Sequence, residues 1–170
     1  MKLVWALRSA LFVLWLVVTV VPWAVLMLLL SLFVRGTRLY WPTIMWLRMA
    51  IWGAKVICGV RYRVHGMEHL PGAAQTHSAV VLAAKHQSTW ETFFLSGFFE
   101  PLSQVLKREL LYVPFFGWAL ALLKPIAIDR SQPKLALKQL AKQGDECLKK
   151  GAWVLIFPEG TRIPVGQMGK

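Results

Sequence analysis

The first third of the chain is dominated by uninterrupted apolar sequence. Residues 9–34 form a run of 26 residues without a charge, bounded by Arg8 and Arg35. About 20 apolar residues in a helix cross a bilayer, so this run predicts a membrane-embedded helix. Pro22 lies near its middle, where it would kink or break a helix, and both a single kinked span and a re-entrant hairpin bent there fit the pattern. A cleaved signal peptide fits less well, because its apolar core has only about 7–15 residues.

A second apolar segment, residues 42–59, has the polar positions of an amphipathic helix. Pro42 is able to begin such a helix and Gly59 to end it. One polar stripe recurs at spacings of four and three: Arg48, Trp52 and Lys55. The tryptophans of this segment suit the depth of lipid headgroups, which predicts a helix lying in the membrane interface. A buried core helix is the alternative that the same pattern allows.

Beyond residue 60, short apolar runs alternate with helical patterns. Runs of strand length are found at residues 80–84, 105–106, 126–128 and 153–157. Helices are predicted at residues 92–95, 115–123 and 133–150. The last helix has an apolar face made of Leu137, Leu140, Ala141, Gly144 and Leu148. Strands that alternate with helices predict an α/β fold with a largely parallel sheet flanked by helices.

The charge of the chain is concentrated where the sequence is most apolar. The 170 residues include 20 Lys or Arg and 8 Asp or Glu, a net charge of +12, and 56% of them are hydrophobic. This composition excludes a disordered chain, and two cysteines exclude a disulfide scaffold. Eight basic residues and no acidic one precede Glu68. Basic residues interleaved with tryptophan and aliphatic runs favour anionic membrane lipids as a partner and disfavour nucleic acid.

Three polar clusters each directly follow a predicted strand. They are His86–Glu91, Asp129–Arg130 and Pro158–Arg162. Functional groups gather at the carboxyl ends of parallel strands, so the three clusters predict one site. A histidine accepts a proton from a hydroxyl near neutral pH, and a carboxylate on its other nitrogen fixes the tautomer. Taken alone, a histidine and a glutamate at this spacing are more often a surface cap and a helix charge.

Two of these clusters resemble motifs of the glycerolipid (lysophospholipid) acyltransferase family. The segment Lys85–Glu91 resembles that family's H-x4-D motif with glutamate in place of aspartate, and Phe157–Arg162 matches its FPEGTR block at every position. Other segments resemble the block between them and the turn before the histidine: Leu106–Leu110, Pro114, Gly117, Ile128–Arg130 and Gly66–Pro71. The match covers about residues 61–169. It implies a glycerol-3-phosphate acyltransferase-like fold preceded by membrane-embedded helical segments.

The resemblance is strongest to the bacterial members of the family that make phosphatidic acid. It implies acyl transfer from acyl-CoA or an acyl carrier protein to the sn-2 hydroxyl of a lysophosphatidic acid, with His86 as the base and Glu91 as its partner. The phosphate of the acceptor calls for charge-assisted donors. The residues implied for the acceptor site are Lys107, Arg130, Glu159, Gly160, Thr161 and Arg162. No metal and no other cofactor is implied.

Several reactive side chains are expected to be structural. His65, His69 and His77 lack the pattern of a metal site, and the two cysteines, Cys58 and Cys147, are not expected to be nucleophiles. Ser88 is a rival acyl nucleophile, but it lies two residues past His86. These expectations leave the acceptor hydroxyl itself as the attacking group.

The resemblance also implies an organisation and a location. Residues 1–60 are predicted to anchor the protein and residues 61–170 to form the acyltransferase domain, on the cytoplasmic face of the bacterial inner membrane. Family members continue past FPEGTR, so we expect the last strands of the sheet to be missing after Lys170. Three alternatives stay open: an enzyme for another lysophospholipid or glycerol 3-phosphate, a thioesterase, and a catalytically inactive lysolipid-binding protein.

Overall fold

A single sheet of parallel strands organises the protein. The computed structural model describes residues 2–69, 79–99 and 101–167. The strands are β1 (Val81–Ala83), β2 (Leu102–Lys107), β3 (Ile126–Ile128) and β4 (Trp153–Ile156). Their order in the sheet is β1-β4-β2-β3, and each neighbouring pair is parallel. The predicted α/β fold with a largely parallel sheet is therefore confirmed.

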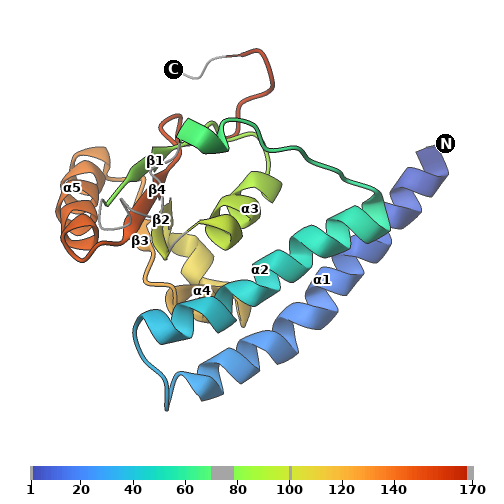
Figure 1. Ribbon diagram of the computed structural model, residues 1–170, viewed down its shortest axis with the longest axis horizontal. Coiled ribbons are helices and arrows are strands. Elements are labelled where there is room, and N and C mark those ends of the chain that lie inside the picture. Colours follow the sequence, from blue (N-terminus) through green and yellow to red (C-terminus); the bar gives the residue numbers. More distant parts are fainter. Residues whose placement is uncertain (1, 70–78, 100, 168–170) are drawn as a thin grey trace.

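The helices between the strands cover both faces of the sheet. They are α3 (Trp90–Phe98), α4 (Phe116–Ala121) and α5 (Pro133–Lys149). Two short 3-10 turns, η1 (Met67–His69) and η3 (Arg108–Tyr112), lie in the loops. Parallel strands need crossover connections, and these helices supply them. Figure 1 shows α5 on one face of the sheet and α3 and α4 on the other.

The buried face of α5 is the predicted one in part: Leu140, Gly144 and Leu148 lie on it, but Leu137 and Ala141 do not. Ala136 and Gly144 are buried, with Leu140 half-buried between them, whereas Leu137 is 67% exposed. Ala141 is exposed as well. Buried positions that recur every four residues form one stripe of a helix, and this stripe is turned by about one residue from the predicted face.

The N-terminal helix α1 (Lys2–Leu30) runs unbroken through Pro22. The hairpin bent at Pro22 is therefore wrong. Proline removes one helical hydrogen bond, but α1 packs on α2 and α4 around this position, where Ala24 and Met27 are buried. By length and composition α1 is able to cross a membrane, and most of its side chains are exposed.

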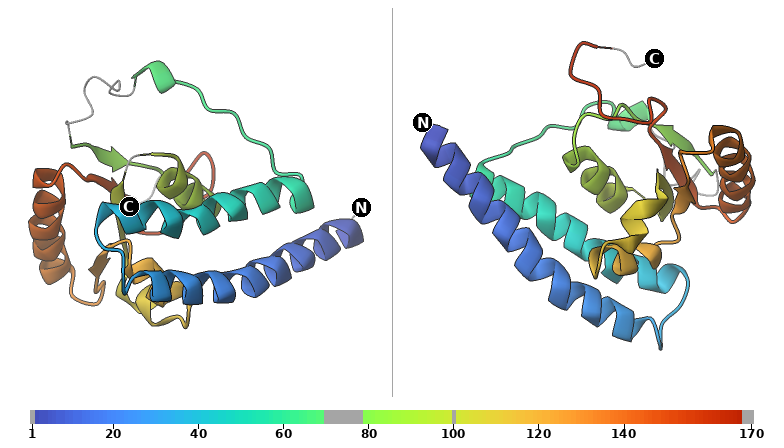
Figure 2. Two further views of the ribbon diagram at one scale, coloured as in Figure 1. Left: turned by 60° about the horizontal axis from the view of Figure 1, so that its bottom comes forward. Right: turned by 180° about the vertical axis from the view of Figure 1, so that it is seen from behind.

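The second helix, α2 (Thr37–Cys58), begins earlier than predicted, so Pro42 lies inside it. Gly59 ends it in the left-handed conformation, with φ of 73°, which confirms the predicted end. Figure 2 shows α1 and α2 as an antiparallel pair beside the rest of the protein. The two helices approach closely, because a Cβ atom on Gly53 would lie 2.5 Å from the Trp15 ring.

Two faces of the second helix differ in burial. Ile44 is fully buried and Leu47 is 6% exposed, as in a core helix. Met45 and Val56 are about half exposed on another face. The prediction of an interfacial helix is therefore wrong for the face that carries Ile44 and Leu47.

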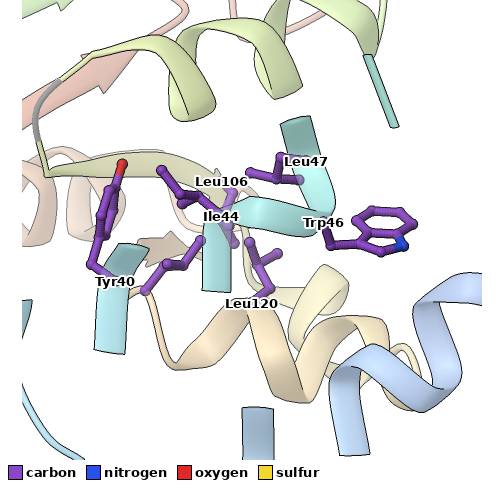
Figure 3. Packing of buried hydrophobic residues seen from close by; sticks show 7 residues of the cluster. Tyr40, Ile44, Trp46, Leu47, Leu106 and Leu120 are labelled. Atoms are coloured by element: carbon purple, nitrogen blue, oxygen red, sulfur yellow. The ribbon is translucent and has the colours of Figure 1, made fainter. Parts of the chain in front are cut away.

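The main apolar core lies between α2 and the sheet. Figure 3 shows residues of this cluster, in which side chains from α2 meet Leu106 of β2 and Leu120 of α4. The buried members are Tyr40, Ile44, Trp46, Leu47, Leu106, Leu120 and Leu123. Each such side chain stabilises the fold by about 1.5–3 kcal/mol when it leaves water. This packing fixes α2 and the strand ends relative to each other.

Candidate active site

The carboxyl ends of all four strands carry polar residues, as the sequence predicts for a single site. His86 follows β1 and the FPEGTR loop follows β4, and these two strands are neighbours. Lys107 ends β2 and Arg130 follows β3. Because the strands are parallel, their carboxyl ends meet at one edge of the sheet. Segments that are far apart in the sequence are brought together there.

His86 and Glu91 form a hydrogen-bonded pair. The distance from His86 Nδ1 to Glu91 Oε1 is 2.8 Å, and both side chains are about four-fifths buried. The extra methylene of glutamate, relative to the aspartate of the family motif, is thus accommodated by the turn. An ionised carboxylate only accepts hydrogen bonds, so Nδ1 carries the proton and Nε2 is the basic nitrogen. The imidazole also stacks on Phe157, with ring centroids 4.3 Å apart.

Local hydrogen bonds hold Glu91 in its ionised form. Burial by itself would raise the pKa of this carboxyl. The hydrogen bonds that Glu91 accepts have a larger, opposite effect, and they come from the Ser88 hydroxyl, the Ser88 backbone N–H and the Gln87 backbone N–H. Together they lower the pKa of Glu91 to about 2. Glu91 is therefore charged at any physiological pH.

The start of α3 explains this arrangement. Ser88 and Glu91 have the spacing of a capping box, in which a glutamate reaches back to the N–H of the residue that caps the helix. Here the Ser88 N–H donates to both Glu91 oxygens, at 2.7 and 3.0 Å, and the Ser88 hydroxyl accepts the Trp90 N–H at 3.0 Å. The S-x-x-E spacing is a sequence signal that would have identified Ser88 as part of the site. Its hydroxyl donates a hydrogen bond to Glu91 and accepts one from the Trp90 N–H at the start of α3.

A cavity of about 510 Å³ opens beside His86. One part of its wall is apolar and comes from α2, α3, β2, η3 and α4. The residues of this part are Leu47, Phe93, Val105, Leu106, Leu110, Phe116 and Leu120. The polar part includes predicted site residues: His86, Lys107, Arg130, Gly160, Thr161 and Arg162. Of the described residues that line it, none is a carboxylate. The cavity therefore has the shape and charge of a site for an amphiphile with an anionic head.

The cations of this cavity are already held in place. Arg162 donates to Thr89 Oγ1 at 2.9 Å, and Arg130 donates to the Gly160 carbonyl oxygen. Lys107 lies 3.2 Å from Glu109 and is about half exposed. An arginine has five N–H donors, so one fixed hydrogen bond leaves others for a ligand. Positioned donors of this kind suit a phosphate group.

Glu159 is a predicted site residue that does not line the cavity. Its Oε1 is 3.0 Å from the Nζ of Lys85, which also donates to the carbonyl oxygen of Gln167. The backbone N–H of Ile163 donates to the His86 carbonyl oxygen at 2.8 Å. These contacts tie the FPEGTR loop to the histidine segment. Sequence reasoning missed Lys85, since nothing in its local pattern indicates a partner 74 residues away.

Of the residues expected to be structural, those that the structure describes do not line the cavity: Cys58, His65, His69 and Cys147. Cys147 Sγ lies 3.4 Å from the Ser103 hydroxyl, and Cys58 contacts the Arg8 backbone. Within the described residues, no three His, Cys, Asp or Glu side chains group as metal ligands do. His77, Leu70 and Pro71 lie outside the described residues.

Comparisons with known proteins agree with these motifs. Residues 61–170 match the family model described as Acyltransferase. The chain is 65% identical, over its whole length, to a 1-acyl-sn-glycerol-3-phosphate acyltransferase of Pseudomonas aeruginosa, of which it spans 65%. It is 39% identical over 110 residues to the Saccharomyces cerevisiae protein of the same name, a match that covers 64% of this chain and 34% of that protein.

A solved structure has the same fold. The crystal structure of the 1-acyl-sn-glycerophosphate acyltransferase from Thermotoga maritima superposes with a TM-score of 0.75 at 23% identity. The similarity covers 98% of this chain and 65% of that one. At this identity the comparison concerns the fold alone.

Proposed function

The chain belongs to the acyltransferase family, and we propose that it transfers an acyl group from a thioester to the sn-2 hydroxyl of 1-acylglycerol 3-phosphate. The product is phosphatidic acid. The observation that carries the proposal is the His86–Glu91 pair at the wall of a cavity lined by three cations. The names of the Pseudomonas and yeast relatives support the choice of acceptor.

His86 acts as the general base in this proposal. Glu91 accepts the Nδ1–H, so the unprotonated Nε2 takes the proton of the sn-2 hydroxyl. The oxygen attacks the thioester carbonyl, the C–S bond breaks, and the proton on Nε2 passes to the departing thiolate. Glu91, charged because of its low pKa, stabilises the imidazolium that forms between these steps. The acceptor hydroxyl is the nucleophile, so no acyl-enzyme forms.

The cations of the cavity bind the phosphate of the acceptor. Arg162, Arg130 and Lys107 surround its polar part, and the apolar wall suits an acyl chain. Gly160, with φ of 64°, turns the loop, and Thr161 lies beside it in the cavity lining. Glu159 positions this loop through Lys85 rather than touching the acceptor. A phosphate held at one end places the sn-2 hydroxyl toward His86.

The proposal includes the donor and the location. The donor is acyl-CoA or an acyl carrier protein, and the reaction uses no metal or other cofactor. The enzyme works at the cytoplasmic face of the bacterial inner membrane, held there by α1, whose length and composition suit a membrane helix. The eight basic residues before Glu68 favour an anionic leaflet.

The direct test is His86→Ala in an assay with lysophosphatidate and an acyl thioester in mixed micelles. Loss of a general base lowers turnover by about 10²–10⁴-fold. His69→Ala is the matched control, because that histidine is about four-fifths exposed and lies outside the cavity lining. Equal turnover by His86→Ala and the parent chain would refute the role of His86.

The same assay separates the alternative functions. Faster turnover of 1-acylglycerol than of its 3-phosphate would refute the phosphate site, and thiol release without an acceptor would indicate a thioesterase. The chain is assayed beside one extended to the length of the Pseudomonas relative. If both the chain and its extended form bind lysolipid but neither transfers an acyl group, a catalytically inactive protein is favoured.

A further inference from the structure

A second, larger cavity lies between α2 and α3. Its volume is about 800 Å³, and the segment after α2 borders it with Arg61 and Tyr62. Figure 1 shows α2 and α3 side by side, with the chain from the end of α2 passing toward η1. Phe93 lines this cavity as well as the one beside His86, whereas the other lining residues differ. The two cavities are therefore neighbours that share Phe93 and otherwise have different walls.

One side of this second cavity is cationic. Arg48, Lys55 and Arg61 line it, and none of its described lining residues is acidic. Arg48 donates its Nε–H to the Gly97 carbonyl oxygen at 2.7 Å. Gly97 permits this close approach, since a Cβ there would lie 3.2 Å from the Arg48 side chain. The ion pairs found among the described residues involve none of these three cations.

The other side is an aromatic wall. Phe94 and Phe98 stack along α3 with ring centroids 4.9 Å apart, and Tyr62 packs on Phe94 at 5.0 Å. Phe98 and Trp52 are 41% and 58% exposed, so much of this apolar surface faces outward. Large exposed apolar surface beside polar residues marks an interaction site.

The surroundings of the cavity indicate a lipid. Trp52 packs against Trp15 of α1, with ring centroids 6.4 Å apart, so the opening adjoins the helix that is able to cross a membrane. Long apolar chains fit the aromatic wall, and a phosphate fits the cationic side. We propose that this cavity binds an anionic phospholipid of the surrounding membrane, with its headgroup phosphate on Lys55, Arg61 and Arg48 and an acyl chain along Phe94 and Phe98. This lipid is distinct from the acceptor in the cavity beside His86.

The test measures retained lipid by native mass spectrometry of the full 170-residue chain in detergent. The probes are dioleoyl phosphatidylglycerol, which is anionic, and dioleoyl phosphatidylcholine, which has the same chains and no net charge. The parent chain retains the anionic lipid preferentially. In Lys55→Gln/Arg61→Gln that retention falls by about 25-fold, because each cation near a headgroup contributes about a factor of five.

Matched variants separate this site from general charge and from the active site. Lys138→Gln/Lys142→Gln removes two charges from α5 and leaves retention unchanged, because neither lysine lines the cavity. Arg162→Gln also leaves retention unchanged, because Arg162 lines only the other cavity. His86→Ala retains the lipid too, so the result does not depend on the proposed catalysis.

Five results would overturn the proposal, four of them in the retention measurements. These four are equal retention of the two lipids by the parent chain, unchanged retention in Lys55→Gln/Arg61→Gln, an equal loss in the α5 variant, and loss in Arg162→Gln alone. Displacement of phosphatidylglycerol by excess free coenzyme A would assign the cavity to the thioester carrier and overturn it as well. Circular dichroism of each variant checks the fold, and a parent-like spectrum is expected for all of them.

Discussion

Replacing Glu91 by glutamine tests the central pair with almost no change in shape. The carboxylate accepts hydrogen bonds from His86 Nδ1, from two backbone N–H groups and from the Ser88 hydroxyl. One oxygen, Oε1, accepts from His86 Nδ1 and from the backbone N–H groups of Gln87 and Ser88. In Glu91→Gln the amide oxygen takes this place and the NH₂ group faces the Ser88 hydroxyl, which is able to accept from it. The tautomer of His86 is therefore kept, and the substitution removes the negative charge that stabilises the imidazolium.

Two effects of different size follow. Turnover falls by about 10- to 100-fold, because the imidazolium of His86 loses a charged hydrogen-bond partner worth about 1.5–3 kcal/mol. Stability falls as well, since the pKa of Glu91 is lowered from 4.5 to about 2. A shift of this size corresponds to at most about 3 kcal/mol of folding stability at neutral pH. The stability is fully present above about pH 4.5 and is lost as the pH falls toward 2.

The assay combines turnover at about pH 7–8, where a histidine base is unprotonated, with denaturant unfolding at several pH values. Glu146→Gln is the matched control, because Glu146 is exposed on α5, away from the site. The stability difference between the parent chain and Glu91→Gln narrows between pH 4.5 and 2, where the parent loses its carboxylate. Loss of parent activity between about pH 5 and 7 does not come from Glu91, which stays ionised there.

The reasoning fails under two outcomes. Turnover of Glu91→Gln within about fivefold of the parent chain would show that the charge of Glu91 does not stabilise the imidazolium of His86. A stability difference that stays constant down to about pH 2 would show that the hydrogen bonds of Ser88 and Gln87 do not favour the ionised carboxylate. If Glu91→Gln loses turnover but has the same free energy of unfolding as the parent chain at neutral pH, the catalytic role of the His86–Glu91 pair is still supported.

Two further predictions concern Arg162 in the FPEGTR loop and Gly117, which is packed near the start of α4. Arg162→Ala raises KM for the phosphorylated acceptor by about 10- to 100-fold with little change in kcat, and an unchanged KM would remove Arg162 from the site. Gly117→Ala lowers stability by about 1–3 kcal/mol in denaturant unfolding, because its Cβ would lie 2.4 Å from the Leu110 carbonyl oxygen. Gly144→Ala, with nothing within 4 Å, is the control and should not destabilise; equal losses would contradict the argument.

Local patterns predicted most of the secondary structure but not which side of each element is buried. The runs at residues 126–128 and 153–156 are strands because they are short apolar runs rich in β-branched and aromatic residues and are bounded by turn residues such as Pro125, Asp129, Gly151 and Pro158. The face of α5 was predicted only in part, and the pattern around Pro22 left a single span and a hairpin both open for α1. Each depends on what lies opposite the helix, and hydrophobicity along one helix carries no information about that partner.

The sequence by itself determined the family, the strand-and-helix alternation and the identity of the paired histidine and glutamate, because each is encoded in short contiguous motifs. Tertiary structure alone decided that Lys85 holds the FPEGTR loop, that Arg162 reaches Thr89, and that α2 forms part of the core. It also decided that the stripe of Arg48, Trp52 and Lys55 faces α3 across a cavity. These contacts join residues about 40 to 80 positions apart, and their geometry exists only once the parallel sheet has brought its strand ends together.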